Sequence, residues 1–451
     1  MQNRNKGITL IALIITIIIL LILVGVSINL AIKGDLFGSA EKAVNGTNAK
    51  VEEQQTAVDE LMGELDEVEK EIEEQQRQQE EAEKQKNLPG TRVSENTKYI
   101  RDGKTAWIPA GFTISKAEGE TTIDGGLVIY LIQDKTEEEI KNLTWTGTEL
   151  ENLKKTYDQF VWIPISHEQI NNMFICQAKT GSNGNCNITV ENGVAKCTTH
   201  NSTQMAGRLY ASSTGENYKT AYKETYTANI GLREPDVVTR NSTGDGSSYD
   251  GNSTYLGYMS TVTGDNTSYT STVKFKETLQ NEYNEIAALI YNAGGYYVGR
   301  YETSNITTTK GTAINVVAGK NSGISNINWY YMYAQQKAYA ANKGLGNKVK
   351  SSMILGTCHD QMLEFVNVAG KYDVTKAGNV GHTSSKFTTK PYLTGGVGYN
   401  ENYSGYETEP YKDLSKNIYD LEGNVYEWTT EAFSEVNRVY RGRQLPPQLF
   451  C

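Results

Sequence analysis

A charge-free apolar run near the start of the chain, Ile8 to Ile32, constrains the fold more than any other feature. At 1.5 Å rise per residue, a helix of this length reaches about 37 Å, which is enough to cross a hydrocarbon core of about 30 Å. A core helix of a soluble protein would carry a polar face, and a cleaved secretory signal would have a shorter apolar region followed by small residues. The run therefore predicts a transmembrane helix over residues 8–32.

The charges around this run predict its orientation. Arg4 and Lys6 precede it, and positive residues favour the cytoplasmic side of a membrane. We therefore expect a single-pass protein of the cell membrane with a cytoplasmic N-terminus and an extracellular bulk. The 451-residue chain has a net charge of −10, which repels phosphate backbones, so nucleic acid is excluded as a partner.

The residues at the start of the apolar run form a recognisable motif. The sequence Lys6-Gly-Ile-Thr-Leu-Ile-Ala12 resembles a type IV prepilin leader, and the resemblance covers about residues 6–32. It implies a leader of residues 1–7, cleavage after Gly7 and methylation of the new N-terminal residue, Ile8. The family usually carries glutamate where this chain has Ala12, and that glutamate is thought to pair with the amine of a neighbouring subunit. A solitary anchor or a minor pseudopilin is therefore favoured over a true pilus subunit.

A polar linker (residues 33–49) and a heptad-patterned segment (residues 50–87) follow the anchor. Apolar residues recur there at alternating steps of three and four, which is typical of a coiled-coil seam. The pattern predicts either a stalk through which copies associate or a single solvated helix that acts as a spacer, since glutamate crowds the other faces. Pro89 and Gly90 should end the helix. The seam residues are Val51, Val58, Leu61, Leu65, Val68 and Ile72.

The remaining chain is long enough for more than one folded unit. The sequence of residues 91–166 predicts a β-rich region of short strands. Residues 167–280 are predicted to form a loop-rich insertion that carries a cysteine cluster. In an exported domain the cluster predicts one disulfide, whose pairing the sequence leaves open. Cys197-Thr-Thr-His200 has the spacing of half a zinc site, but no second pair with matching spacing supports it. The clustered cysteines are Cys176, Cys186 and Cys197, and Cys358 and Cys451 lie further along.

The last third of the chain contains a series of motifs in a characteristic order. A strand, a helix through about Asn342 and a second helix over 357–368 precede two short motifs. The motifs are Tyr297-Val-Gly-Arg-Tyr-Glu302 in the strand, then Gly423-Asn-Val-Tyr-Glu-Trp428 and Arg438-Val-Tyr-Arg-Gly442. In this order they resemble the formylglycine-generating enzyme family, also called sulfatase-modifying factor domains, from about Asn281 to Gly442, within an incomplete domain of residues 281–451. The resemblance implies a C-type-lectin-like fold, so we expect an α+β head.

One of these motifs carries oxygen ligands. Asp420 and Glu427 offer carboxylates, and Gly423 and Val425 offer backbone carbonyls. Calcium prefers such oxygen ligands at about 2.3–2.6 Å, and the family resemblance implies calcium at these four positions. The alternative is a structural turn in which Asn424 and Glu427 bond only to local backbone.

The C-terminal end argues against catalysis. Catalytic members of the family carry two cysteines after the Arg-Val-x-Arg-Gly motif, and these bind copper, which prefers thiolates when reduced. Only Cys451 follows Gly442 here, so the family domain looks truncated and we expect no enzyme. The residues from Arg443 onward fit neither a strand nor the family. We hypothesise that they are read out of frame, because a one-base shift permits a family-like continuation.

Together these features predict an extracellular ligand-binding or adhesion protein with a pilin-like anchor. The expected ligand-binding face contains Tyr426, Arg438 and Tyr440. Two alternatives remain open at this stage. One is an oxidase of the formylglycine-generating type, and the other is a minor pilin or pseudopilin subunit.

Overall fold

The computed structural model describes nine parts of the chain, which fall into two compact units, Met1–Ala82 and Glu83–Cys451. No helix among these parts has the length and apolar character needed to cross a bilayer. The predicted leader with Gly7 and Ile8, and the predicted membrane helix over 8–32, lie outside them. The described residues are 44–176, 186–208, 233–234, 253–305, 314–318, 329–367, 414–419, 427–432 and 438–441.

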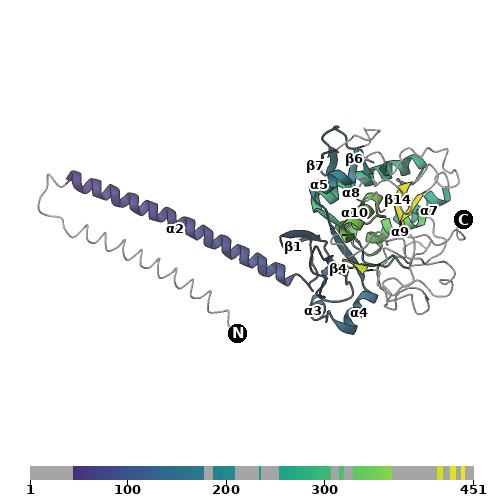
Figure 1. The fold of residues 1–451 in the computed structure, drawn as a ribbon, viewed down its shortest axis with the longest axis horizontal. Helices are drawn as coiled ribbons and strands as arrows, with labels where there is room; N and C mark the ends of the chain where they lie inside the picture. Colours follow the sequence, from purple (N-terminus) through teal and green to yellow (C-terminus); the bar gives the residue numbers. More distant parts are fainter. Residues whose placement is uncertain are drawn as a thin grey trace. The chain divides into compact units, whose positions relative to one another are not determined.

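The heptad segment lies within one continuous 44-residue helix, α2 (Val44–Asn87), drawn in purple in Figure 1. The helix begins before residue 50, so the end of the predicted linker is helical. Seam residue Val68 is 50% exposed, which leaves part of the apolar seam open to solvent. Lys84 and Lys86 occupy the last turn, where positive charge complements the helix dipole.

Within the second unit, the end of α2 is joined to the first hairpin of the head. The Gln85 side chain donates to the Lys98 carbonyl at 3.1 Å and accepts from the Ile100 N–H at 2.8 Å. This hairpin consists of β1 (Thr97–Arg101) and β2 (Lys104–Ile108). Asp102 and Gly103 connect the strands with φ of 53° and 73°, as an Asp-Gly hairpin turn requires.

The central sheet has four antiparallel strands in the order β11-β5-β4-β3. Successive side chains of β4 and β5 alternate between two apolar clusters, because neighbouring residues of a strand point to opposite faces. Val161 and Ile163 belong to one cluster, and Trp162 belongs to the other. The sheet is therefore buried on both faces. Its strands are β3 (Thr113–Ile114), β4 (Val128–Leu131), β5 (Asp158–Pro164) and β11 (Gly295–Gly299).

Helices supply the rest of the core. Predicted helix ends agree with the structure for α9 (Trp329–Asn342) and nearly so for α10 (Gly356–Asn367). The long helix α8 (Thr272–Ala293) ends at Gly294, whose φ of 70° is left-handed. The remaining helices are α3 (Glu137–Lys141), α4 (Gly147–Thr156), α5 (His167–Met173), α7 (Ser253–Thr263) and the 3-10 helix η2 (Gly346–Lys348).

The segment predicted as a loop-rich insertion, 167–280, contains regular structure. Helices α5 and α7 and the first turns of α8 fall within it, together with two small sheets. These elements were not predicted, because the segment is rich in Gly, Ser, Thr and Asn, a composition that is typical of loops. The sheets contain β6 (Phe174–Cys176), β9 (Met205–Arg208) and β10 (Arg233–Glu234), and β7 (Ile188–Glu191) with β8 (Val194–Cys197).

Two hairpins lie near the end of the described chain. The first pairs β12 (Leu414–Ser415) with β13 (Ile418–Tyr419), and the second pairs β14 (Glu427–Ala432) with β15 (Arg438–Arg441).

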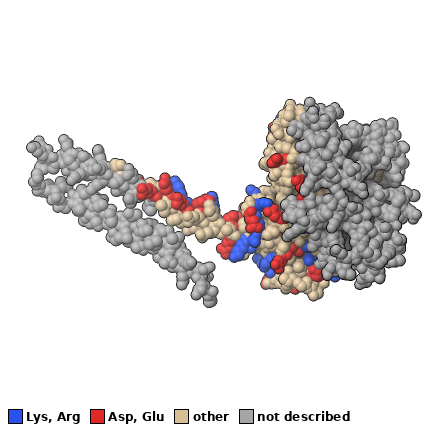
Figure 2. Space-filling model, in the orientation of Figure 1, with Lys and Arg blue, Asp and Glu red and all other residues tan. Residues whose placement is uncertain are grey.

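Acidic and basic side chains are interspersed over the described part of the face in Figure 2, and no continuous basic surface is visible there.

Candidate metal centre

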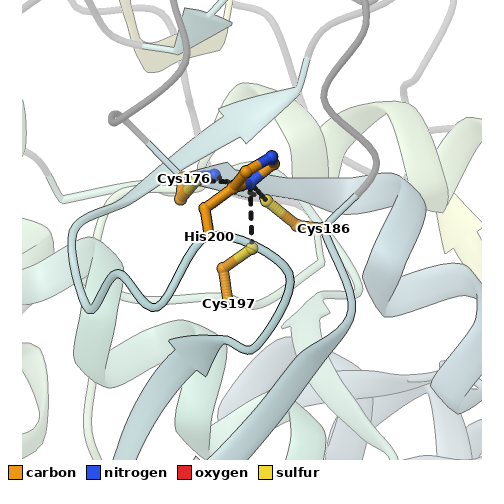
Figure 3. A group of neighbouring side chains, drawn as sticks. All are labelled: Cys176, Cys186, Cys197 and His200. Atoms are coloured by element: carbon orange, nitrogen blue, oxygen red, sulfur yellow. Dashed lines mark hydrogen bonds between the residues drawn. The ribbon is translucent and has the colours of Figure 1, made fainter.

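Four side chains with metal-ligating atoms converge in the region predicted as an insertion. Cys176 ends β6, and Cys197 ends β8. Cys186 precedes β7, and His200 lies in the turn that follows β8. Figure 3 shows the three thiols arranged around the imidazole of His200.

The distances within this cluster match a metal coordination shell. His200 Nδ1 lies 3.1 Å from Cys176 Sγ, 3.6 Å from Cys186 Sγ and 3.3 Å from Cys197 Sγ. All four ligand atoms lie within 4.8 Å of one another. A tetrahedral zinc ion, with Zn–S near 2.3 Å and Zn–N near 2.0–2.1 Å, places neighbouring ligand atoms about 3.6–3.8 Å apart. The four atoms therefore stand close to where one zinc ion would hold them.

Local backbone structure brings the ligands together. Asn192 and Gly193, with φ of 52° and 78°, turn β7 back into β8. This return places Cys197 opposite Ile188 in the hairpin register. Ser202 then exchanges two backbone hydrogen bonds with Cys197, at 2.8 and 3.2 Å. The hairpin and its tight turn thus aim Cys197 and His200 at the same point.

Further hydrogen bonds hold the other side of the cluster. The Cys176 N–H donates to Cys186 Sγ at 3.1 Å, a contact that stabilises negative charge on the sulfur. The Ile188 N–H donates to the Asn171 side chain at 2.7 Å, and the Thr198 N–H donates to the Asn187 carbonyl at 2.9 Å. Hydrogen bonds of this kind orient the residues that bind a metal and tune its affinity.

Burial determines the chemistry that the cluster supports. Cys176, Cys186 and Cys197 are at most 1% exposed, and His200 is half-buried. Burial, followed by hydrogen bonding with Cys197, raises the pKa of the Cys186 thiol well above its usual value. A bound cation reverses this effect because it deprotonates its thiol ligands outright.

The donor set distinguishes a structural site from a catalytic one. Three sulfurs and one imidazole nitrogen complete a tetrahedral shell, as in structural zinc sites, whereas catalytic zinc keeps one position open for water or substrate. Soft thiolate ligands also disfavour calcium and magnesium, which prefer oxygen. The cluster is therefore suited to holding a zinc ion and leaves no place for a substrate on it.

The structure does not test the calcium site predicted from the sequence. Asp420, Gly423 and Val425 lie outside the described residues, and Glu427 is described only as the first backbone position of β14. The predicted ligand-binding face likewise stays a prediction. Tyr426 lies outside the described residues, while Arg438 and Tyr440 are described as backbone positions of β15, opposite Ala432 and Trp428.

Sequence reasoning found only half of the metal cluster. It noted the Cys197 and His200 pair as half a zinc site, and it expected one disulfide among Cys176, Cys186 and Cys197 with the pairing left open. The ligands are spaced more widely than in common zinc motifs, because Cys176 ends β6 and Cys197 ends β8, and these strands belong to two different sheets. The signal that was present was the number of ligands: three cysteines and a histidine between residues 176 and 200 make up a full tetrahedral set.

None of the four cysteines that the structure describes forms a disulfide, so the disulfide expected within the cluster is not present. No family model matches the chain, and no match was found among curated proteins or solved structures.

Proposed function

We propose that this chain is a membrane-anchored extracellular binding protein without catalysis, whose head is held together by a structural zinc ion. The ion is bound by Cys176, Cys186, Cys197 and His200. The observation that carries the proposal is the convergence of these four ligand atoms within 4.8 Å. The apolar run at 8–32 supports the anchor, and the motifs shared with sulfatase-modifying factor domains support a head that binds a ligand.

The position of the cluster explains why the head would need an ion there. The three cysteines continue the largest apolar cluster, together with Ile188 and Ala195 of the β7–β8 hairpin. An isolated two-stranded hairpin is marginally stable in water. An ion bound by both β6 and β8 would join this hairpin to the main core.

The closed shell argues against catalysis at the metal. Four protein ligands leave no open coordination position on it for a substrate. Binding is then the role left to the surface of the head. Calcium at Asp420, Gly423, Val425 and Glu427 and a ligand face at Tyr426, Arg438 and Tyr440 remain part of this proposal.

Metal analysis of the full-length chain tests the zinc centre. We expect about one zinc per chain by mass spectrometry of the purified protein, and release of this zinc by a mercurial that titrates thiolates. Cobalt substitution should give the intense visible bands of tetrahedral thiolate coordination. A metal-free protein with no affinity for zinc or cobalt would refute the centre.

Surface exposure is tested separately. External protease added to intact cells should remove the second unit, while a cytosolic marker protein stays intact. A chain that is protected on intact cells and degraded only after lysis would refute the anchored, extracellular orientation.

A further inference from the structure

A cavity of about 540 Å³ runs along the outer edge of β11. This strand stands at the end of the sheet order, with β5 on its inner side. All five of its residues line the cavity, Gly295 and Gly299 included. Because glycine has no side chain, the strand backbone itself forms part of the wall.

The cavity extends over both faces of the sheet. Trp162 and Tyr297, from one apolar cluster, line it together with Ile290 and Tyr296 from the other. A cavity lined from both faces at the position of an end strand must pass around the strand's free edge. Its volume lies in the range of about 300–1,000 Å³ that is usual for ligand sites.

Hydrogen-bond alternation shows which backbone groups point into this space. The Trp162 N–H donates to the Leu127 carbonyl at 3.0 Å, toward the β4 side of the sheet. In an antiparallel pair, Trp162 and its partner Tyr297 therefore form a non-hydrogen-bonded position. The N–H and C=O of Tyr297 consequently point away from β5, and within the described parts of the chain no other segment bonds to them.

A second continuous stretch of chain lines the cavity together with β11. Residues 348–355 all line it. The Lys348 side chain at its start is exposed and has no acidic partner among the described residues. The edge strand β11 and residues 348–355 together line a slot, which carries a positive charge at Lys348.

A buried donor in the slot is also unused. Trp162 is 2% exposed, and its indole Nε1–H has no hydrogen-bond acceptor within the described structure. A buried donor without an acceptor lowers the stability of the fold, because it has lost its hydrogen bonds to water. An acceptor brought by a ligand would recover part of this stability.

We propose that this slot binds an extended peptide, which adds to β11 as a fifth strand. Backbone pairing with Tyr297 and its neighbours would supply affinity, as in other cases of strand addition. Alternate apolar or aromatic side chains of the peptide would pack against the aromatic residues that line the slot. A carboxylate near one end of the peptide would form an ion pair with Lys348. This inference rests on the proposal that the head is a binding domain, and it names the class of partner.

The test selects peptides on the full-length chain held in lipid nanodiscs, using a display library of linear random peptides. We expect enrichment of sequences with alternating apolar residues. N-methylation of every second residue, in the register that faces β11, should weaken their binding by at least about tenfold, because it removes the N–H donors and leaves the side chains.

A matched pair of variants on α9 locates the site. Gln336 is half-buried and lines the cavity, so Gln336→Trp should fill the slot and weaken peptide binding by at least about tenfold. Ala341 is exposed on the same helix and does not line the cavity, so Ala341→Trp should leave binding unchanged. Thermal unfolding of both variants verifies that they fold.

Three results would overturn the inference: no enriched peptide, equal binding to Gln336→Trp, or equal binding after N-methylation. Zinc content is measured on the same preparation, and protease exposure is measured on intact cells that express the chain. If both hold while peptides fail to bind, only the peptide inference is lost. If either fails while peptides bind, the zinc centre or the surface location is at fault instead.

Discussion

Cys186 shows how strongly a single residue can depend on an ion. Its thiol is buried, its pKa is raised by that burial, and its sulfur contacts both the Cys176 N–H and His200. We expect Cys186→Ser to lower zinc affinity by at least about tenfold, since removing even an outer-shell partner typically costs that much. Competition with a chromogenic chelator measures the affinity.

Cys451→Ser provides the control, because the four described ligands complete a tetrahedral shell without a further thiol. This variant should bind zinc as the unmodified chain does. Zinc affinity that is the same in both variants would contradict the assignment of Cys186 as a ligand.

A buried carboxylate gives the head a dependence on acid. Burial alone raises the pKa of Glu282, but Lys337 and hydrogen bonds from Ser352 and Tyr333 outweigh it and leave the pKa below its ordinary value. A lowered folded-state pKa contributes stability that is present above the ordinary value near 4.5 and is lost as pH falls below it. Urea unfolding of Glu282→Gln between pH 3 and 7 should therefore show a shallower loss of stability toward acid. An unchanged slope would refute this role.

The pair of Arg300 and Glu120 is the most deeply buried ion pair among the described residues, at 2.6 Å and with both side chains under 5% exposed. Glu120→Gln leaves the Arg300 charge without its partner carboxylate, which typically costs about 3–5 kcal/mol. Denaturant unfolding measures this cost. Lys104→Met, which breaks an exposed pair with Asp124, should cost less than about 1 kcal/mol. Similar losses in the two variants would contradict the argument from burial.

At the scale of elements, two glycines in helical contexts should respond in opposite ways to the same substitution. Gly294 ends α8 with φ of 70°, so Gly294→Ala should destabilise the head by about 1–2 kcal/mol. Gly63 lies within α2 with nothing within 4 Å of an added Cβ, so Gly63→Ala should stabilise that helix by about 0.5–1 kcal/mol. Thermal unfolding followed by circular dichroism measures both, and a shift of the same sign in both variants would refute the distinction.

Elements with local signals could be predicted from the sequence. The end of α9 follows from Gly344 beyond it, and β11 follows from its two tyrosines and valine. Pairing between distant segments could not be predicted, because nothing local specifies that β6 pairs with β9 or that β5 separates β4 from β11. The metal cluster depends on such pairing, so the sequence showed only its locally spaced half, Cys197 and His200.

At the scale of the whole molecule, the two compact units should respond separately to metal removal. Hydrogen exchange after treatment with a chelator should quicken in β6 and β8, which end at ligands Cys176 and Cys197, and in β9, which pairs with β6. Exchange within the first unit's part of α2 should not change, because no cluster ligand lies there. Uniform acceleration over the whole chain would show that the ion does not act locally.

The number of thiols around His200 bears on how such a head matures. Each disulfide uses two thiols, so oxidation of a set of three always leaves one sulfur unpaired. The imidazole then also has no bonding partner in the cluster. Ion capture is the route that engages all four groups at once. A chain whose thiols are oxidised before it meets zinc would therefore reach a different and less complete end state, and the order of the two events would decide which form of the head is displayed.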